Sequence, residues 1–174
     1  MIGNLTPKEE SQFRMTYLAG ITLYTTQRCE RILAEAVMWI SLTGGNVSRE
    51  SLFAMDAEHF NATLGQMRAV LRNEFDLTPE IADRLKKFAD DRNRFVHRLF
   101  WEPGFDIDDP NCCDGVCPFI HGLMVESEAI ANMISGALFA SYRATGRTSS
   151  PELLKLFEHV PKPSVTINEL FPPR

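Results

Sequence analysis

The stretch TPEIADRLKKFADDRNRFVHRLF, residues 78–100, decides the fold class of this 174-residue chain. Thr78 followed by Pro79 is typical of a helix start, because the Thr hydroxyl caps backbone N–H groups and the Pro ring suits the first helical position. Side chains then recur in steps of four and three, as on one helix face. The members of this seam are Ile81, Leu85, Phe88, Arg92, Phe95 and Leu99. The stretch predicts one amphipathic helix, which the turn sequence at 101–104 ends.

Similar start and stop signals occur along the rest of the chain. The sequence TPKE at residues 6–9 has the pattern of a capping box. Helices are expected at residues 6–42, from residue 46 or 48 to 75, at 78–100, at about 118–142 and at 150–159. No convincing strand pattern or repeat is present. We therefore predict an all-α bundle of four long helices plus a short C-terminal helix, forming one domain over residues 1–160 and followed by a Pro-rich tail over 161–174.

Composition narrows the class of protein. The formal net charge of −5 argues against a protein that coats nucleic acid by bulk charge. The N-terminus lacks the pattern of a secretory signal, and no apolar run approaches the roughly 20 residues that span a membrane. The four Cys residues include the adjacent pair Cys112 and Cys113, which is not a secreted disulfide framework. We expect a cytoplasmic protein that does not contact a membrane.

Arg92 interrupts an otherwise apolar seam. A charged group in such a stripe is costly unless it meets a partner or a ligand. One interpretation is structural, in which Arg92 extends toward solvent or pairs with a buried Glu from another helix. The other is functional, in which Arg92 faces a cleft and binds a ligand.

His97 follows Arg92 by five positions. On an ideal helix it projects about 140° away from Arg92, so the two side chains are expected to diverge. Asn93 lies four positions before His97 and shares its face, where it could orient the imidazole. The alternative is that His97 is an ordinary surface histidine.

A basic strip lies beside His97. Residues 84–98 hold six basic and two acidic residues, although the whole chain is acidic. Lys87, Arg94 and Arg98 fall within about 40° of one another around the helix, and such a strip would attract a polyanion. The alternative is surface salt bridging between residues four apart, Lys87 with Asp91 and Asp90 with Arg94.

The sequence RNRFVH, residues 92–97, resembles the signature of HEPN domains: an Arg, a polar residue directly after it, and a His after a short spacer. The flanking LKKF at 85–88 and RLF at 98–100 are similar to that family's third helix, and TLGQ at 63–66 is similar to a segment of its preceding helix. The resemblance covers about residues 6–145. It implies a HEPN-like homodimer of helical bundles whose two motifs face a shared cleft.

Catalytic HEPN proteins are metal-independent endoribonucleases, so the resemblance implies RNA as substrate and no metal or cofactor. The 2′-hydroxyl of the RNA would attack the phosphate, with His97 as general acid or base, Arg92 stabilising the developing charge and Asn93 positioning His97. The strip Lys87, Arg94 and Arg98 would bind the RNA backbone.

The family also suggests a biological setting. It implies a toxin or antiphage defence protein with an antitoxin or other protein partner. Some HEPN toxins carry Tyr where this chain has Leu99, so the control by Tyr modification that they use is not expected. The alternative function is that of a non-catalytic HEPN-like helical dimer that binds a protein or a ligand.

Two further groups of residues could bind metal. Cys112, Cys113, Cys117 and His121 have the right ligand types for zinc, but adjacent Cys residues rarely bind one ion without strain. The acidic sequence at 106–109 lacks the Gly and terminal Glu of a calcium loop. We expect reduced thiols in a loop and no metal site.

Overall fold

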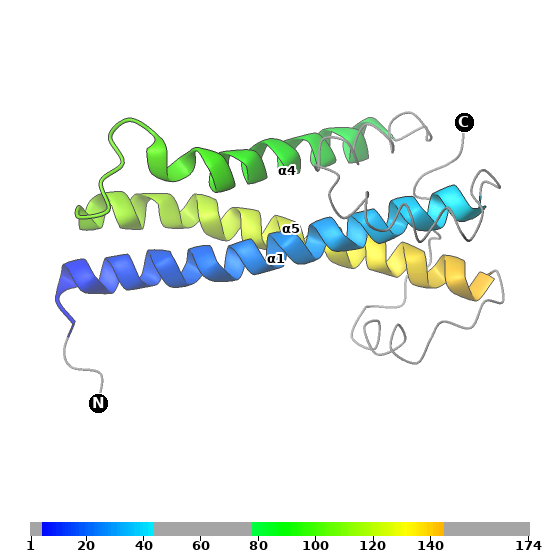
Figure 1. Ribbon diagram of the computed structural model, residues 1–174, viewed down its shortest axis with the longest axis horizontal. Coiled ribbons are helices and arrows are strands. Elements are labelled where there is room, and N and C mark those ends of the chain that lie inside the picture. The colour runs from blue at the N-terminus through cyan, green and yellow to red at the C-terminus, as the bar shows by residue number, and fades with distance from the viewer. Residues whose placement is uncertain (1–4, 44–77, 145–174) are drawn as a thin grey trace. The chain divides into compact units, whose positions relative to one another are not determined.

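The computed structural model describes residues 5–43 and 78–144. They form three long helices, α1 (Pro7–Thr43), α4 (Pro79–His97) and α5 (Pro110–Ala144), and the short 3₁₀ helix η1 (Leu99–Trp101) (Figure 1). No strand occurs within these two ranges, so the all-α class is confirmed for them. The helices expected at 46–75 and 150–159 and the tail at 161–174 lie outside the described residues.

The starts of α1 and α4 follow the capping signals of the sequence. The Thr6 N–H donates to Glu9 Oε2 at 2.8 Å, and the Glu9 N–H donates to Thr6 Oγ1 at 3.3 Å, which is the reciprocal pattern of a capping box. The hydrogen bonds that the Thr6 N–H and hydroxyl donate to the Glu9 carboxylate hold the pKa of Glu9 below its ordinary value. At α4, the Ile81 N–H points to Thr78 Oγ1 at 3.5 Å. Both predicted caps are confirmed.

The start of α5 differs from the expected Pro118. The helix begins eight positions earlier at Pro110, and Pro118 lies inside it. The Asp109 side chain accepts a hydrogen bond from the Asn111 N–H at 2.9 Å, so Asp109 caps a helix whose first residue is a proline. The three clustered Cys residues are therefore helical. The sequence places the same cap-then-Pro pattern at 109–110 as at the other two starts, and this signal outweighs the missing N–H of Pro118.

The chain divides into two compact units, one of residues 1–27 and 87–128 and the other of residues 28–86 and 129–174. The three long helices each contribute one part to each unit. This division neither supports nor contradicts one helical domain over residues 1–160, which stays a prediction.

In the first unit, the early parts of α1 and α5 run parallel and pack through small polar side chains. Thr22 Oγ1 donates to the Ile120 carbonyl at 3.3 Å, and the hydroxyls of Thr26 and Ser127 are 3.2 Å apart. Ser127 also donates to the Leu123 carbonyl at 2.7 Å. No buried side-chain N or O of the described residues lacks a hydrogen-bond partner. Short side chains let two helices approach closely, and their hydroxyls are satisfied where they meet.

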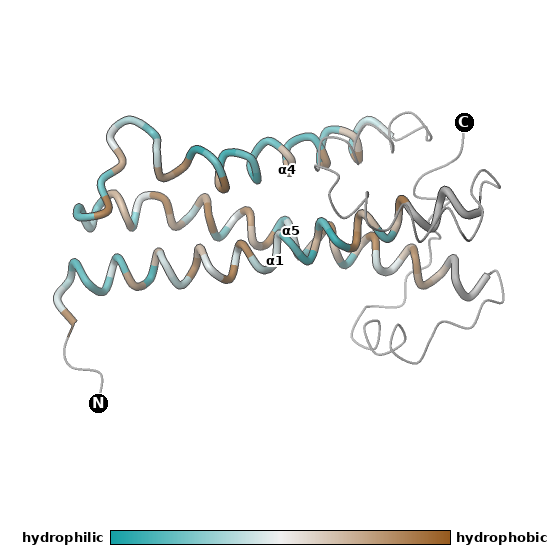
Figure 2. The backbone as a smooth tube through the Cα atoms, in the orientation of Figure 1, coloured by the Kyte–Doolittle hydropathy of each residue, from teal (hydrophilic) through white to brown (hydrophobic). Residues whose placement is uncertain are grey.

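The seam of α4 is largely confirmed. Phe88, Phe95 and, just beyond the helix, Leu99 are buried in the first unit, while Arg92 is only half-buried. The rest of the helix is polar, and Figure 2 shows α4 as mostly hydrophilic with few apolar positions.

The seam expected on α1 is only partly right. The sequence predicts an inner stripe of Leu18, Ile21, Thr25, Cys29, Ile32, Ala36 and Trp39. Thr25, Cys29 and Ala36 are buried, but Ile21 is exposed and its neighbour Thr22 is buried. The hydrogen bond from Thr22 to α5 explains this exchange, because it lets a polar residue occupy the inner face.

The second unit has its own apolar core. Its buried side chains are Cys29, Leu33, Ala34, Ala36, Val37, Leu85, Ile130, Ala131, Ile134, Ala137 and Leu138. On α5 the sequence predicts an inner face of Leu123, Ile130, Ile134, Ala137 and Ser141, and the first four of these residues are buried.

Helix α5 is also apolar enough to be compared with a membrane span. Its residues Pro110–Ala140 reach a mean hydropathy of 1.2 over 18 residues, and half of that window is buried inside the protein. By length and composition alone α5 could cross a membrane, and the expectation of a protein without membrane contact stays a prediction. The core helix of a soluble protein has the same length and composition, so the finding is weak evidence for a membrane.

Candidate functional site

The last two turns of α4 bring three predicted site residues together. Arg92 Nη1 lies 3.3 Å from Asn93 Oδ1 and 3.3 Å from His97 Nε2. Asn93 and His97 are exposed and Arg92 is half-buried. One chain therefore presents a guanidinium, an amide and an imidazole as one accessible group.

The expected divergence of Arg92 and His97 is wrong at the level of their polar ends. Their Cβ atoms leave the helix in different directions, as five positions of separation dictate. The Arg side chain has a long flexible stem, however, and it carries the guanidinium around the helix to the imidazole. Residue spacing fixes where a side chain begins but not where a long one ends.

The contact between Arg92 and His97 involves the Nε2 atom of the imidazole. A guanidinium only donates hydrogen bonds, so His97 Nε2 must accept. The Nε2 lone pair is thus available to a proton donor that displaces the Arg92 contact, as a general base requires.

The basic strip is partly occupied by carboxylates. Lys87 forms an ion pair with Asp91, as the salt-bridge interpretation predicts. Arg94 does not use the predicted Asp90. Its Nε and Nη2 donate to the two Glu102 oxygens at 2.7 and 2.8 Å, and its guanidinium carbon lies 4.4 Å from the centre of the Phe119 ring.

The third member of the strip differs from the other two. Arg98 is exposed and forms no ion pair within residues 5–43 and 78–144. The pairing of Arg94 raises the pKa of its guanidinium and lowers the pKa of the Glu102 carboxyl, mainly through their hydrogen bonds. Arg98 is therefore the cation of the strip that can bind an anion without first losing a carboxylate.

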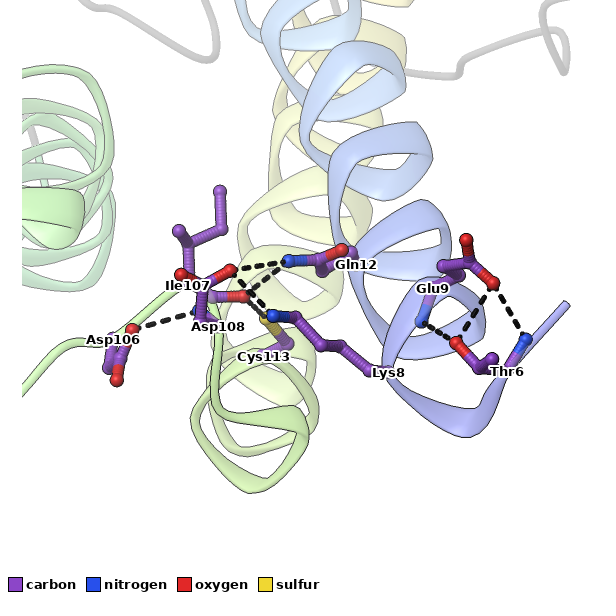
Figure 3. A network of polar contacts seen from close by, with 8 residues as sticks. All are labelled: Thr6, Lys8, Glu9, Gln12, Asp106, Ile107, Asp108 and Cys113. Atoms are coloured by element: carbon purple, nitrogen blue, oxygen red, sulfur yellow. Dashed lines mark hydrogen bonds and ion pairs between the residues drawn. The ribbon is translucent and has the colours of Figure 1, made fainter.

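Residues 102–109, which connect η1 to α5, are fixed to α1 by a polar network (Figure 3). Lys8 Nζ lies 3.0 Å from Asp108 Oδ1, and Gln12 Nε2 donates to the Ile107 carbonyl at 2.9 Å. The Lys8 hydrogen bond and charge hold the pKa of Asp108 below its ordinary value. The acidic residues that the sequence left unassigned thus include a structural partner of α1.

The clustered thiols make hydrogen bonds instead of forming a metal site. Cys112, Cys113 and Cys117 donate to the carbonyls of Gly104, Ile107 and Cys113 at 3.4, 3.3 and 3.2 Å. Burial raises the pKa of Cys113 and Cys117, which favours protonated thiols. Among the described residues, no group of three His, Cys, Asp or Glu side chains is placed to hold a metal ion.

Sequence reasoning missed the role of Glu102. It lies eight positions after Arg94, beyond the end of α4, so helical periodicity gives no signal for the pair.

No family model, curated protein or solved structure matches this chain.

Proposed function

We propose that this protein is a metal-independent endoribonuclease of HEPN type that cleaves RNA by attack of its own 2′-hydroxyl. The observation that supports the proposal is the contact of Arg92 with both Asn93 and His97 at the exposed end of α4. An imidazole with a basic nitrogen beside a guanidinium is the pair of groups that phosphodiester cleavage needs.

Each residue has a role in this chemistry. His97 Nε2 takes the 2′-hydroxyl proton as the oxygen attacks the phosphorus, and the bond to the 5′-oxygen breaks. Arg92 leaves the imidazole and binds the phosphoryl oxygens, where negative charge develops. Asn93 positions Arg92 and His97. The leaving 5′-oxygen takes a proton from the His97 of a second copy of the chain, so the proposal includes a homodimer with two motifs in one cleft.

The strip Lys87, Arg94 and Arg98 binds the RNA backbone in this proposal. Arg98 contributes most, because Lys87 and Arg94 must exchange a carboxylate for a phosphate. Such an exchange returns little free energy, since one charge-assisted hydrogen bond replaces another. The cytoplasmic setting, as a toxin or antiphage defence protein with a protein partner, belongs to the same proposal.

A second candidate function is a non-catalytic helical dimer that binds another protein or a ligand. Exposed aromatic side chains on α1 favour it. Phe13, Tyr17 and Tyr24 are 64%, 63% and 71% exposed, and the first two stack with ring centres 6.1 Å apart. Aromatic residues are enriched at protein interfaces.

The test is cleavage of labelled single-stranded RNA in EDTA by the full chain and by Arg92→Ala and His97→Ala. Lys86→Ala is the matched control, because Lys86 is an exposed cation of the same helix outside the proposed site. Cleavage to 2′,3′-cyclic phosphate ends by the wild type and control, with both site variants inactive, supports the nuclease. If all four proteins are equally inert on varied RNAs, the nuclease is refuted and the second candidate remains.

A further inference from the structure

Trp101 is the most exposed large apolar side chain among the described residues. Its exposed fraction is 85%. An indole left in water forfeits the roughly 1.5–3 kcal/mol that burial of a large apolar side chain gives. Its position directly after the proposed catalytic helix suggests that a ligand covers it.

The backbone of η1 turns this indole outward. A 3₁₀ helix has three residues per turn, so Leu99, Phe100 and Trp101 point about 120° apart. Leu99 is 1% exposed, and the Phe100 ring packs edge-on against Phe95 and Phe105, with ring centres 6.4 and 5.4 Å apart. Two of the three side chains therefore anchor the turn and present the third to solvent.

The turn that carries Trp101 also carries a cation, the exposed Arg98. The backbone N–H of Trp101 donates to the Arg98 carbonyl at 2.7 Å, so the two residues belong to one turn, and the exposed Arg98 forms no ion pair within residues 5–43 and 78–144. The next residue in the chain, Glu102, has its charge offset by two hydrogen bonds from Arg94. A single flat aromatic ring with a cation beside it fits a nucleotide, whose base stacks while its phosphate meets the cation.

We propose that Trp101 is the stacking platform for an unpaired base of single-stranded RNA, with Arg98 binding the phosphate of that strand. This inference rests on the proposed function and adds the substrate class. His97 and Trp101 are four residues apart in the chain, so the phosphate at His97 and the base on Trp101 belong to one RNA strand. A duplex is excluded because its bases already stack on one another.

The binding test uses the fluorescence of Trp101 itself. The chain has two Trp residues, so Trp39→Phe leaves Trp101 as the only emitter. The probe is a 2′-O-methyl oligouridine, which lacks the nucleophile and cannot be cleaved, and the control probe is the same strand in a duplex. The single strand is expected to quench Trp101 and the duplex is not. Trp101→Ala should weaken binding roughly tenfold to a hundredfold, and Trp101→Phe should restore part of the loss.

Phe13→Ala is the matched control for binding, because Phe13 is also an exposed aromatic but belongs to α1. It should leave the affinity unchanged. Equal quenching by strand and duplex, or equal affinity of Trp101→Ala and wild type, would overturn the stacking proposal. It is also overturned if the Trp101 emission shifts to the blue as protein concentration rises without RNA, since a second copy then covers the indole.

Failure of this inference is distinguishable from failure of the nuclease. If the wild type cleaves RNA but Trp101 is not quenched, the platform is refuted and the nuclease stands. If the single strand quenches Trp101 but no RNA is cut, the platform stands and the nuclease is refuted.

Discussion

Arg94 and Glu102 join the end of α4 to the segment that follows it. Two parallel hydrogen bonds of 2.7 and 2.8 Å link the guanidinium to the carboxylate, and Phe119 of α5 packs against the same guanidinium. One Arg side chain thus connects three elements of the first unit. This contact fixes the chain directly after η1 to α4 and α5.

The ion pair of Arg94 and Glu102 should have a measurable but small coupling energy. Both side chains are about 40% exposed, so solvent screens their charges, while the two-point geometry favours the upper end of the range for surface pairs. We expect a small positive coupling from a double-mutant cycle of Arg94→Ala and Glu102→Ala in urea unfolding. If the effects of the two single substitutions simply add, the ion pair contributes nothing measurable to stability.

Stability should fall in acid. The pKa values of Glu102 and Asp108 are lowered from 4.5 and 3.8 by their cationic partners, so the folded state binds fewer protons than the unfolded state. Their contribution is complete above these ordinary values and is lost as pH falls through the lower values of the folded protein. The free energy of unfolding, measured from pH 7 to pH 2, should decline less steeply in Glu102→Gln. An unchanged slope would contradict this assignment.

Phe88 should be far more important for stability than Phe13. Phe88 is 1% exposed and Phe13 is 64% exposed. Truncation of a buried Phe to Ala typically costs about 3–5 kcal/mol, whereas surface changes stay within about 0.5 kcal/mol. Chemical denaturation of Phe88→Ala and Phe13→Ala measures both, and similar losses in the two variants would refute the described core of the first unit.

Arg92→Lys should not rescue the proposed nuclease. A single guanidinium nitrogen, Nη1, contacts both Asn93 Oδ1 and His97 Nε2, so lysine could keep the charge and one such donor, but it lacks the planar pair of nitrogens that binds two phosphoryl oxygens at once. We expect the cleavage rate to fall by about tenfold to a thousandfold, the scale seen when one oxyanion donor is lost. A rate within twofold of wild type would show that only charge is required at this position.

Patterns among residues close together in the sequence predicted more of this structure than could be predicted of contacts between residues far apart in the sequence. Thr6 and Thr78 mark helix starts because a cap depends on residues within one turn. The sequence shows the same cap-then-Pro pattern at Asp109 and Pro110, but the helix start was expected at Pro118 instead. By contrast, the pairing of Arg94 with Glu102 depends on how the chain turns after α4, which no periodicity encodes.

In the candidate site, too, the part that depends on residues close in sequence was predictable and the rest was not. The sequence singled out Arg92, Asn93 and His97 from their types and spacing, and the structure brings their polar atoms together. It did not single out Trp101, because one aromatic residue in a turn has no pattern around it. Its exposure is visible only once Leu99 and Phe100 are seen to be anchored.

The parallel packing of α1 and α5 has a consequence for how the protein is made. Ser11 donates to Asp114, 103 residues further along the chain, at 3.2 Å. At synthesis rates of about 5–20 residues per second, the segment of α5 that packs against the start of α1 is synthesised roughly 5–20 s later. Contacts between such distant segments also slow folding. A ribosome that stalls before α5 therefore releases a chain that cannot complete the first unit, including the environment of His97 and Trp101.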